Sequence, residues 1–149
     1  MPISQRKVSV KFGMASTAIN GVTVFLNENR PRTGRVAAGN EELSASMIGL
    51  RDGERFVPKE IIVDLCTSPG GGGTTAVYQL RRGIASGAMG NNGTALTITT
   101  GVTSGRLGIA APTAYGPSDR MTLGVTGAGG AANHTSIARV EGYIIGRGK

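Results

Sequence analysis

Apolar residues recur at every second position in several short segments of the chain. The clearest case is residues 7–12, whose inward side chains are expected to be Val8, Val10 and Phe12. The same alternation marks residues 94–100 and 120–125. Because successive side chains of a β-strand point to opposite faces of the sheet, this period predicts strands with one buried face.

Other segments are apolar without strict alternation. Residues 60–66 form a nearly continuous apolar run, which predicts a central strand. Further strands are expected, in chain order, at 22–26, 55–57, 74–81, 106–109 and 134–145. In the last of these segments the expected core residues are Ile137, Val140, Tyr143, Ile144 and Ile145.

Turn signals separate the expected strands. Asn20-Gly21 and Asn92-Gly93 are dipeptides typical of tight β-turns. The 25 glycines do not recur at every third residue, which excludes a collagen helix and assigns them to loops and turns. Residues 40–49 are the one helix candidate, with Asn40 placed to cap the first turn.

About eight short strands without alternating helices predict an all-β fold. We expect an antiparallel β-sandwich, jelly-roll-like or barrel-like, with long Gly-rich loops and at most one short helix. A length of 149 residues fits a single domain spanning 1–149. Within it, residues 1–11 are expected to form an N-terminal arm or an edge strand.

The chain is strongly basic, with a formal net charge of +7. After Asp64 the only acidic residues are Asp119 and Glu141. A basic surface favours anionic partners, such as nucleic acid, an anionic membrane or an acidic protein surface. The residues expected to dock a partner are two clusters of cations, namely Arg6, Lys7, Lys11, Arg30, Arg32 and Arg35.

Candidate catalytic chemistry is scarce. The single Cys66 excludes an intrachain disulfide and lies in an apolar run, so we expect it to be buried. Together with the single His134 it falls short of the four nitrogen or sulfur ligands of a structural zinc site. Glu60 and Asp64 flank one strand, with both side chains expected on its outward side. Residues 69–75 lack the lysine of a P-loop. We therefore expect no enzyme, no cofactor and no metal.

Residues 119–133 and 136–144 read as a strand, a small-residue loop and a closing strand that ends in an aromatic-aliphatic pair. This pattern resembles the C-terminal hairpin of small β-sandwich structural proteins of tailed bacteriophages, especially capsid decoration (cement) proteins. The Thr/Gly/Ala-rich texture of residues 67–135 is similar to that class. The resemblance implies attachment to the outside of an icosahedral shell as a homodimer or homotrimer, often with an N-terminal arm on the shell.

That resemblance makes the major capsid protein and further copies of the chain the expected partners. The N-terminus has no apolar signal region, and no apolar run approaches the ~18 residues of a membrane span. We therefore expect synthesis in the host cytoplasm, no membrane partner and a final place on the capsid surface of the virion.

Two other functions remain open from the residues alone. The same texture fits another virion component, such as a tail, head-completion or receptor-binding module. The charge of +7 fits a nucleic-acid-binding β-barrel. Proteins that bind single strands usually add aromatic side chains on which bases stack, and this chain has three Tyr, three Phe and no Trp.

Overall fold

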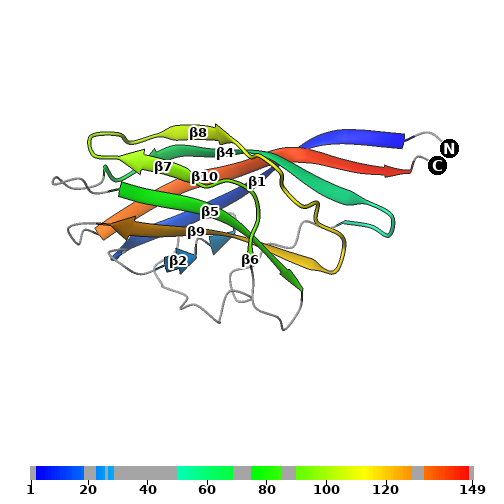
Figure 1. The fold of residues 1–149 in the computed structure, drawn as a ribbon, viewed down its shortest axis with the longest axis horizontal. Helices are drawn as coiled ribbons and strands as arrows, with labels where there is room; N and C mark the ends of the chain where they lie inside the picture. The colour runs from blue at the N-terminus through cyan, green and yellow to red at the C-terminus, as the bar shows by residue number, and fades with distance from the viewer. Residues whose placement is uncertain are drawn as a thin grey trace.

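The computed structural model describes residues 3–18, 23–25, 27–28, 50–68, 75–84, 90–128 and 133–147. These residues form ten strands in two antiparallel sheets and contain no helix (Figure 1). The expected all-β antiparallel fold is thereby confirmed. The strands beyond the expected eight include two that are only two residues long.

Each sheet gathers strands from distant parts of the chain. Sheet A has the order β3 (Asn27–Glu28), β1 (Ile3–Ala18), β10 (Asn133–Arg147), β4 (Arg55–Cys66) and β8 (Gly105–Gly108). Sheet B has the order β2 (Thr23–Phe25), β9 (Asp119–Ala128), β5 (Thr75–Ile84) and β6 (Gly90–Asn91), with β7 (Leu96–Thr99) also paired to β5.

The first and last strands lie side by side in sheet A, which brings the two chain ends together (Figure 1). They pair from Ile3 opposite Arg147 to Ala18 opposite Asn133, with one irregularity after Met14. The part of the expected N-terminal arm that the structure describes is therefore the start of β1. Among the described residues, the other side of β1 is paired only with β3, at Phe12 and Gly13.

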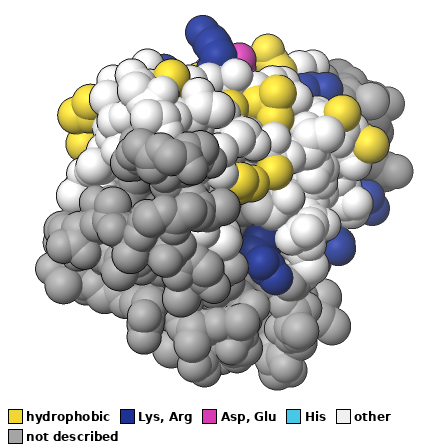
Figure 2. Space-filling model, turned by 60° about the vertical axis from the view of Figure 1, so that its left-hand side comes forward, with side chains coloured by type: hydrophobic (Ala, Val, Ile, Leu, Met, Phe, Trp, Pro, Cys, Tyr) yellow, Lys and Arg dark blue, Asp and Glu magenta, His cyan; other side chains and the backbone are white. Residues whose placement is uncertain are grey.

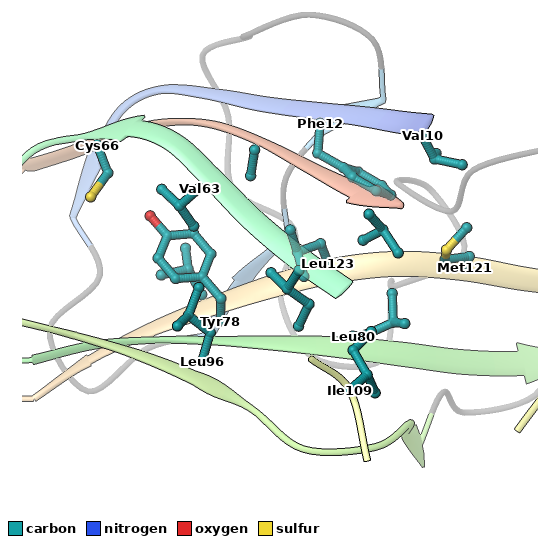
Figure 3. Close-up of a cluster of buried hydrophobic side chains, with 14 of the residues drawn as sticks. Val10, Phe12, Val63, Cys66, Tyr78, Leu80, Leu96, Ile109, Met121 and Leu123 are labelled. Carbon is teal, nitrogen blue, oxygen red and sulfur yellow. The ribbon is translucent and has the colours of Figure 1, made fainter. Parts of the chain in front are cut away.

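The hydrophobic core lies between the two sheets (Figure 3). Sheet A contributes Val10, Phe12, Phe56, Ile61 and Val63, and sheet B contributes Tyr78, Leu80, Leu96, Leu123 and Val125. The expected burial of Val10 and Phe12 is confirmed, and Val8 is partly buried against the same core.

In β10 the expected core set is only partly right. Val140 and Ile144 are buried, whereas Tyr143 and Ile145 are half-buried and Ile137 is 48% exposed. The reason is the period of two, which turns Ala138, Val140 and Ile144 inward and the residues between them outward.

The two strands expected at 55–57 and 60–66 are one strand, β4, and its central place between β10 and β8 is confirmed. Pro58 lies between the two segments and has no N–H to donate to a neighbouring strand, so the sequence alone favours two separate strands. The sheet absorbs the interruption as a bulge, because Glu60 pairs with Glu141 and Pro58 pairs with Gly142, which leaves Lys59 as the extra residue.

The turn expected at Asn92-Gly93 does not reverse the chain, because β6 and β7, on either side of it, both pair antiparallel with β5, and the chain only bends there. Gly93 has a φ of +79°, and Asn92 exchanges two hydrogen bonds with the backbone of Thr113. The turn expected at Asn20-Gly21 and the helix expected at 40–49 lie outside the described residues. In the described part of the chain, no helix is long and apolar enough to cross a membrane.

Candidate docking surface

Three of the six cations expected to dock a partner lie on β1. Lys7 and Lys11 project from the outer face of sheet A, away from sheet B, and both are exposed. Arg6 is also exposed and lies near the end of β4, with its guanidinium 3.7 Å from Glu54. The second expected cluster, Arg30, Arg32 and Arg35, lies outside the described residues.

The outer face of sheet A is organised in rows that run across the strands. We name them by their chemistry: the aromatic row is Lys7, Tyr143 and Val57; the acidic row is Ser9, Glu141 and Glu60; the basic row is Lys11, Arg139, Ile62 and Arg106; the aliphatic row is Gly13, Ile137 and Leu65. Two carboxylates therefore stand next to each other in the acidic row and two cations in the basic row, and opposite charges of these rows meet only between rows.

One pair between the acidic and basic rows has bidentate geometry. Arg106 donates from Nη2 and Nε to the two carboxylate oxygens of Glu60, at 2.8 and 2.9 Å. The hydrogen bond from Arg106 lowers the pKa of the Glu60 carboxyl, and the same contact raises the pKa of Arg106. Both groups therefore remain charged near neutral pH, and the pair ties β8 to β4.

A second set of ion pairs is centred on β10. Arg139 contacts Glu141 on its own strand and Asp64 on β4, at 2.5 and 3.2 Å. Glu141 also lies 3.6 Å from the ammonium group of Lys7 on β1. The expected outward placement of Asp64 is confirmed, and its carboxylate belongs to this network. Lys11 directly faces Arg139 across the strands, so like charges are adjacent in the basic row.

Two apolar features complete the outer face. Ile62 is only 6% exposed although it points outward, because it pairs between Arg139 and Arg106, whose aliphatic stems can cover it. Ile137 and Leu65 are cross-strand partners and are 48% and 57% exposed. Figure 2 shows exposed hydrophobic side chains and Lys and Arg groups together on one face of the molecule.

Sequence reasoning missed Arg106, Arg139 and the Ile137–Leu65 pair as surface features. The alternation in residues 134–145 carried a usable signal, since Arg139 and Glu141 are two residues apart and must share a face with Ile137. Assigning Ile137 to the core was the error that concealed it.

A polar pocket of about 250 Å³ lies at the end of sheet B, lined by Gly53, Glu54, Arg55, Arg82, Ala114, Gly116, Pro117 and Asp119. The Asp119 carboxylate accepts hydrogen bonds from the Gly116 N–H at 2.7 Å and from Arg82 at 2.9 Å. Glu54 accepts a hydrogen bond from the Arg51 N–H at 2.8 Å. Both carboxylates therefore hold turns in place, and these lining residues include no nucleophilic Ser or Cys and no His.

A buried polar cluster joins the two sheets. The Tyr78 hydroxyl of sheet B bonds to Ser136 of sheet A and lies near the Cys66 thiol (Figure 3). Burial raises the pKa of both Tyr78 and Cys66. The expected burial of Cys66 is confirmed, and a thiol held protonated inside the core is a poor nucleophile.

Among the described residues, no three His, Cys, Asp or Glu side chains are grouped closely enough to hold a metal ion. No family model matches the chain, and no curated protein matches it either.

Proposed function

We propose that this protein is a non-enzymatic structural component of a virion that binds the outside of a phage capsid and stabilises it. The resemblance of its C-terminal half to phage decoration proteins supports this function. The two-sheet fold is also compatible with it. The proposed partners are the major capsid protein and further copies of the chain.

The observation that carries the docking role is the basic N-terminal part of β1. Arg6 and Lys7 have side chains 59% and 66% exposed, and Lys11 is exposed on the same strand. Within the described part of the chain, β3 pairs with β1 only at Phe12 and Gly13. No described residue pairs with this side of residues 5–11, which suits the addition of an extended segment of a partner as a further strand. The three cations favour an acidic segment.

The polar pocket supports a binding role better than catalysis. A general acid or base needs a carboxylate free to approach a substrate. In the pocket, Asp119 is engaged by Gly116 and Arg82, and Glu54 by Arg51.

Nucleic-acid binding is less well supported, because most aromatic rings with described side chains are inside. Tyr78, Tyr115 and Phe56 have no exposed surface, and Phe12 is 2% exposed. Tyr143 is half-buried on the outer face of sheet A. Bases have few rings on which to stack, so this alternative would have to rest on phosphate contacts alone.

Charge reversal on β1 tests the docking role. Arg6→Glu should weaken binding to undecorated shells by at least about tenfold, because a cation beside the proposed partner segment becomes an anion, and Arg6 lies outside the four rows of the outer face. Lys59→Glu is the matched control, since Lys59 is also exposed but lies at the bulge of β4. Co-sedimentation of each purified variant with shells measures the binding.

Equal binding of the wild type and both variants would contradict docking through β1. Failure of the wild-type protein to bind shells would contradict the capsid role itself. Gold labelling of intact particles would then show whether the protein belongs to another part of the virion.

A further inference from the structure

The rows on the outer face of sheet A are arranged so that the face is complementary to itself. The acidic and basic rows lie next to each other at the centre, and the aromatic and aliphatic rows flank them, each two residues further along β1 and β10. A surface that pairs with a copy of itself must carry such matched features on the two sides of a two-fold axis.

Two in-plane axes align two such faces, and the charges distinguish between them. An axis parallel to the strands would place β10 of one copy over β4 of the other, with Glu141 facing Glu60. An axis perpendicular to the strands, between the acidic and basic rows, would instead superpose each strand on its own copy. Glu141 then faces Arg139 of the second copy.

The second arrangement also matches the apolar rows. Tyr143 would lie over Ile137 of the second copy, and Val57 would lie over Leu65. Lys7 would lie over Gly13, where no side chain obstructs it. About this axis Glu141 and Arg139 form the pair of opposite charges, while Glu60 lies over Ile62 and Lys11 lies over Ser9. The first arrangement also matches apolar groups, but it brings Glu141 to Glu60 and Lys11 to Arg106, so the charges favour the second.

We infer that the outer face of sheet A binds the same face of a second copy of this chain, about a two-fold axis that runs across the strands between the acidic and basic rows. This inference rests on the self-association included in the proposed function and specifies its surface and symmetry. It selects a homodimer over a homotrimer.

The size of the face sets the expected strength of the dimer. Four strands about 4.8 Å apart and four rows about 7 Å apart cover roughly 500 Å² in each copy. The total of about 1,000 Å² is near the lower limit for specific interfaces. The dimer should therefore dissociate on dilution, and salt should weaken it because its central contacts are ion pairs.

The symmetry has a consequence for docking. An axis across the strands keeps β1 of one copy over β1 of the other, so the outer edges of both β1 strands lie on the same side of the dimer, while Lys7 and Lys11 project into the interface and Arg6 is the cation left at each edge. Two edges on one side can bind a shell simultaneously, which raises the apparent affinity without any new contact.

Reciprocal charge variants test the pairing directly. Glu141→Lys places a lysine opposite Arg139 of the second copy, and Arg139→Glu places a glutamate opposite Glu141. Each variant alone should dimerise at least about tenfold more weakly than the wild type. An equimolar mixture of the two should dimerise again, because every facing pair then has opposite charges.

Sedimentation velocity over a concentration series measures these equilibria, and thermal unfolding confirms that each variant is folded. If either variant fails to fold, Leu65→Ser replaces it, since Leu65 is exposed and its loss should weaken the dimer without opening the core. A monomeric wild type at all concentrations, a trimer, or a mixture that stays monomeric would overturn the inference. The shell-binding assay is a separate readout, so the dimer and the capsid role can fail independently.

Discussion

The two faces of sheet A come from the same strands but follow different physical rules. On the inner face of β10, Ala138, Val140 and Ile144 are packed against sheet B, where a change of one methyl group is felt. On the outer face, Arg139 and Glu141 lie in a network of ion pairs that water and salt can replace. The inner face therefore determines stability, whereas the outer face is free to determine which partners bind.

The largest effect should come from filling space on the inner face. A Cβ added at Gly142 would overlap the carbonyl oxygen of Val57 and lie 2.9 Å from Phe56 Cζ and from Pro58 Cα. We expect Gly142→Ala to lower the free energy of unfolding by roughly 3 kcal/mol, because backbone at the bulge must move. Urea denaturation measures the change.

The matched control is Gly108→Ala, on β8. The nearest atom to a Cβ there is the Lys59 carbonyl oxygen at 4.0 Å, so this substitution should be nearly neutral. If the two alanine variants have the same stability, Gly142 does not pack closely against the bulge of β4, and the two faces of sheet A differ less in their contribution to stability.

An intermediate effect should come from the polar cluster between the sheets. Tyr78→Phe removes the hydroxyl that bonds to Ser136. The buried hydroxyl of Ser136 then has no partner from Tyr78, which should lower the free energy of unfolding by about 1–2 kcal/mol. Burial raises the pKa of Tyr78, so above its ordinary value of 10.0 the unfolded chain loses a proton that the folded chain retains. Stability should therefore fall as the pH rises above 10.0, and less steeply in the variant.

Urea unfolding of both proteins at neutral pH and at about pH 10.5 tests this expectation. Tyr115 supplies an internal reference, since burial also raises its pKa and it is present in both proteins. An unchanged alkaline slope in the variant would mean that Tyr78 is not the group that resists ionisation.

The smallest effect should come from the ion pairs of the outer face. The Arg106 hydrogen bond holds the pKa of Glu60 below its ordinary value of 4.5, so the folded state keeps this carboxylate ionised where the unfolded state takes up a proton. The stabilisation is present above pH 4.5 and is lost as the pH falls through the lowered pKa. Glu60→Gln should therefore lower stability slightly at neutral pH, and the two proteins should become equally stable as the pH falls, which flattens the acid limb of the stability curve.

Thermal unfolding at low and high salt separates the contribution of the Arg106–Glu60 ion pair from that of packing. Salt should reduce the difference in stability between the wild type and Glu60→Gln. A large loss of stability at neutral pH would show that the outer face contributes to folding as the inner face does.

The local pattern of apolar residues was sufficient to predict the strands, but not to predict which strands pair with each other. Residues 7–12 and 120–125 alternate, and the structure places them in β1 and β9. Burial of Cys66 followed from its apolar neighbours. The bulge that joins β4 into one strand could not be read from Pro58 alone, because the compensating residue, Gly142, is on another strand.

The candidate surface depended even more on distant residues. The Arg106–Glu60 pair joins residues 46 positions apart, and the Arg139–Asp64 pair joins residues 75 positions apart. Ile137 is exposed because the other set of alternate residues in β10 faces sheet B. A period of two shows that a strand has two faces, but it does not show which face is buried.

By itself, the sequence determined that this protein is an all-β chain with one buried thiol and an excess of positive charge. Those properties follow from the period of apolar side chains, which is local, and from composition, which is a sum over the whole chain. Only the tertiary structure decided the rows on sheet A, since a row exists only after strand register has aligned residues from β1, β10, β4 and β8. Register is a property of paired strands, so the chemistry of the outer face emerges only when they meet.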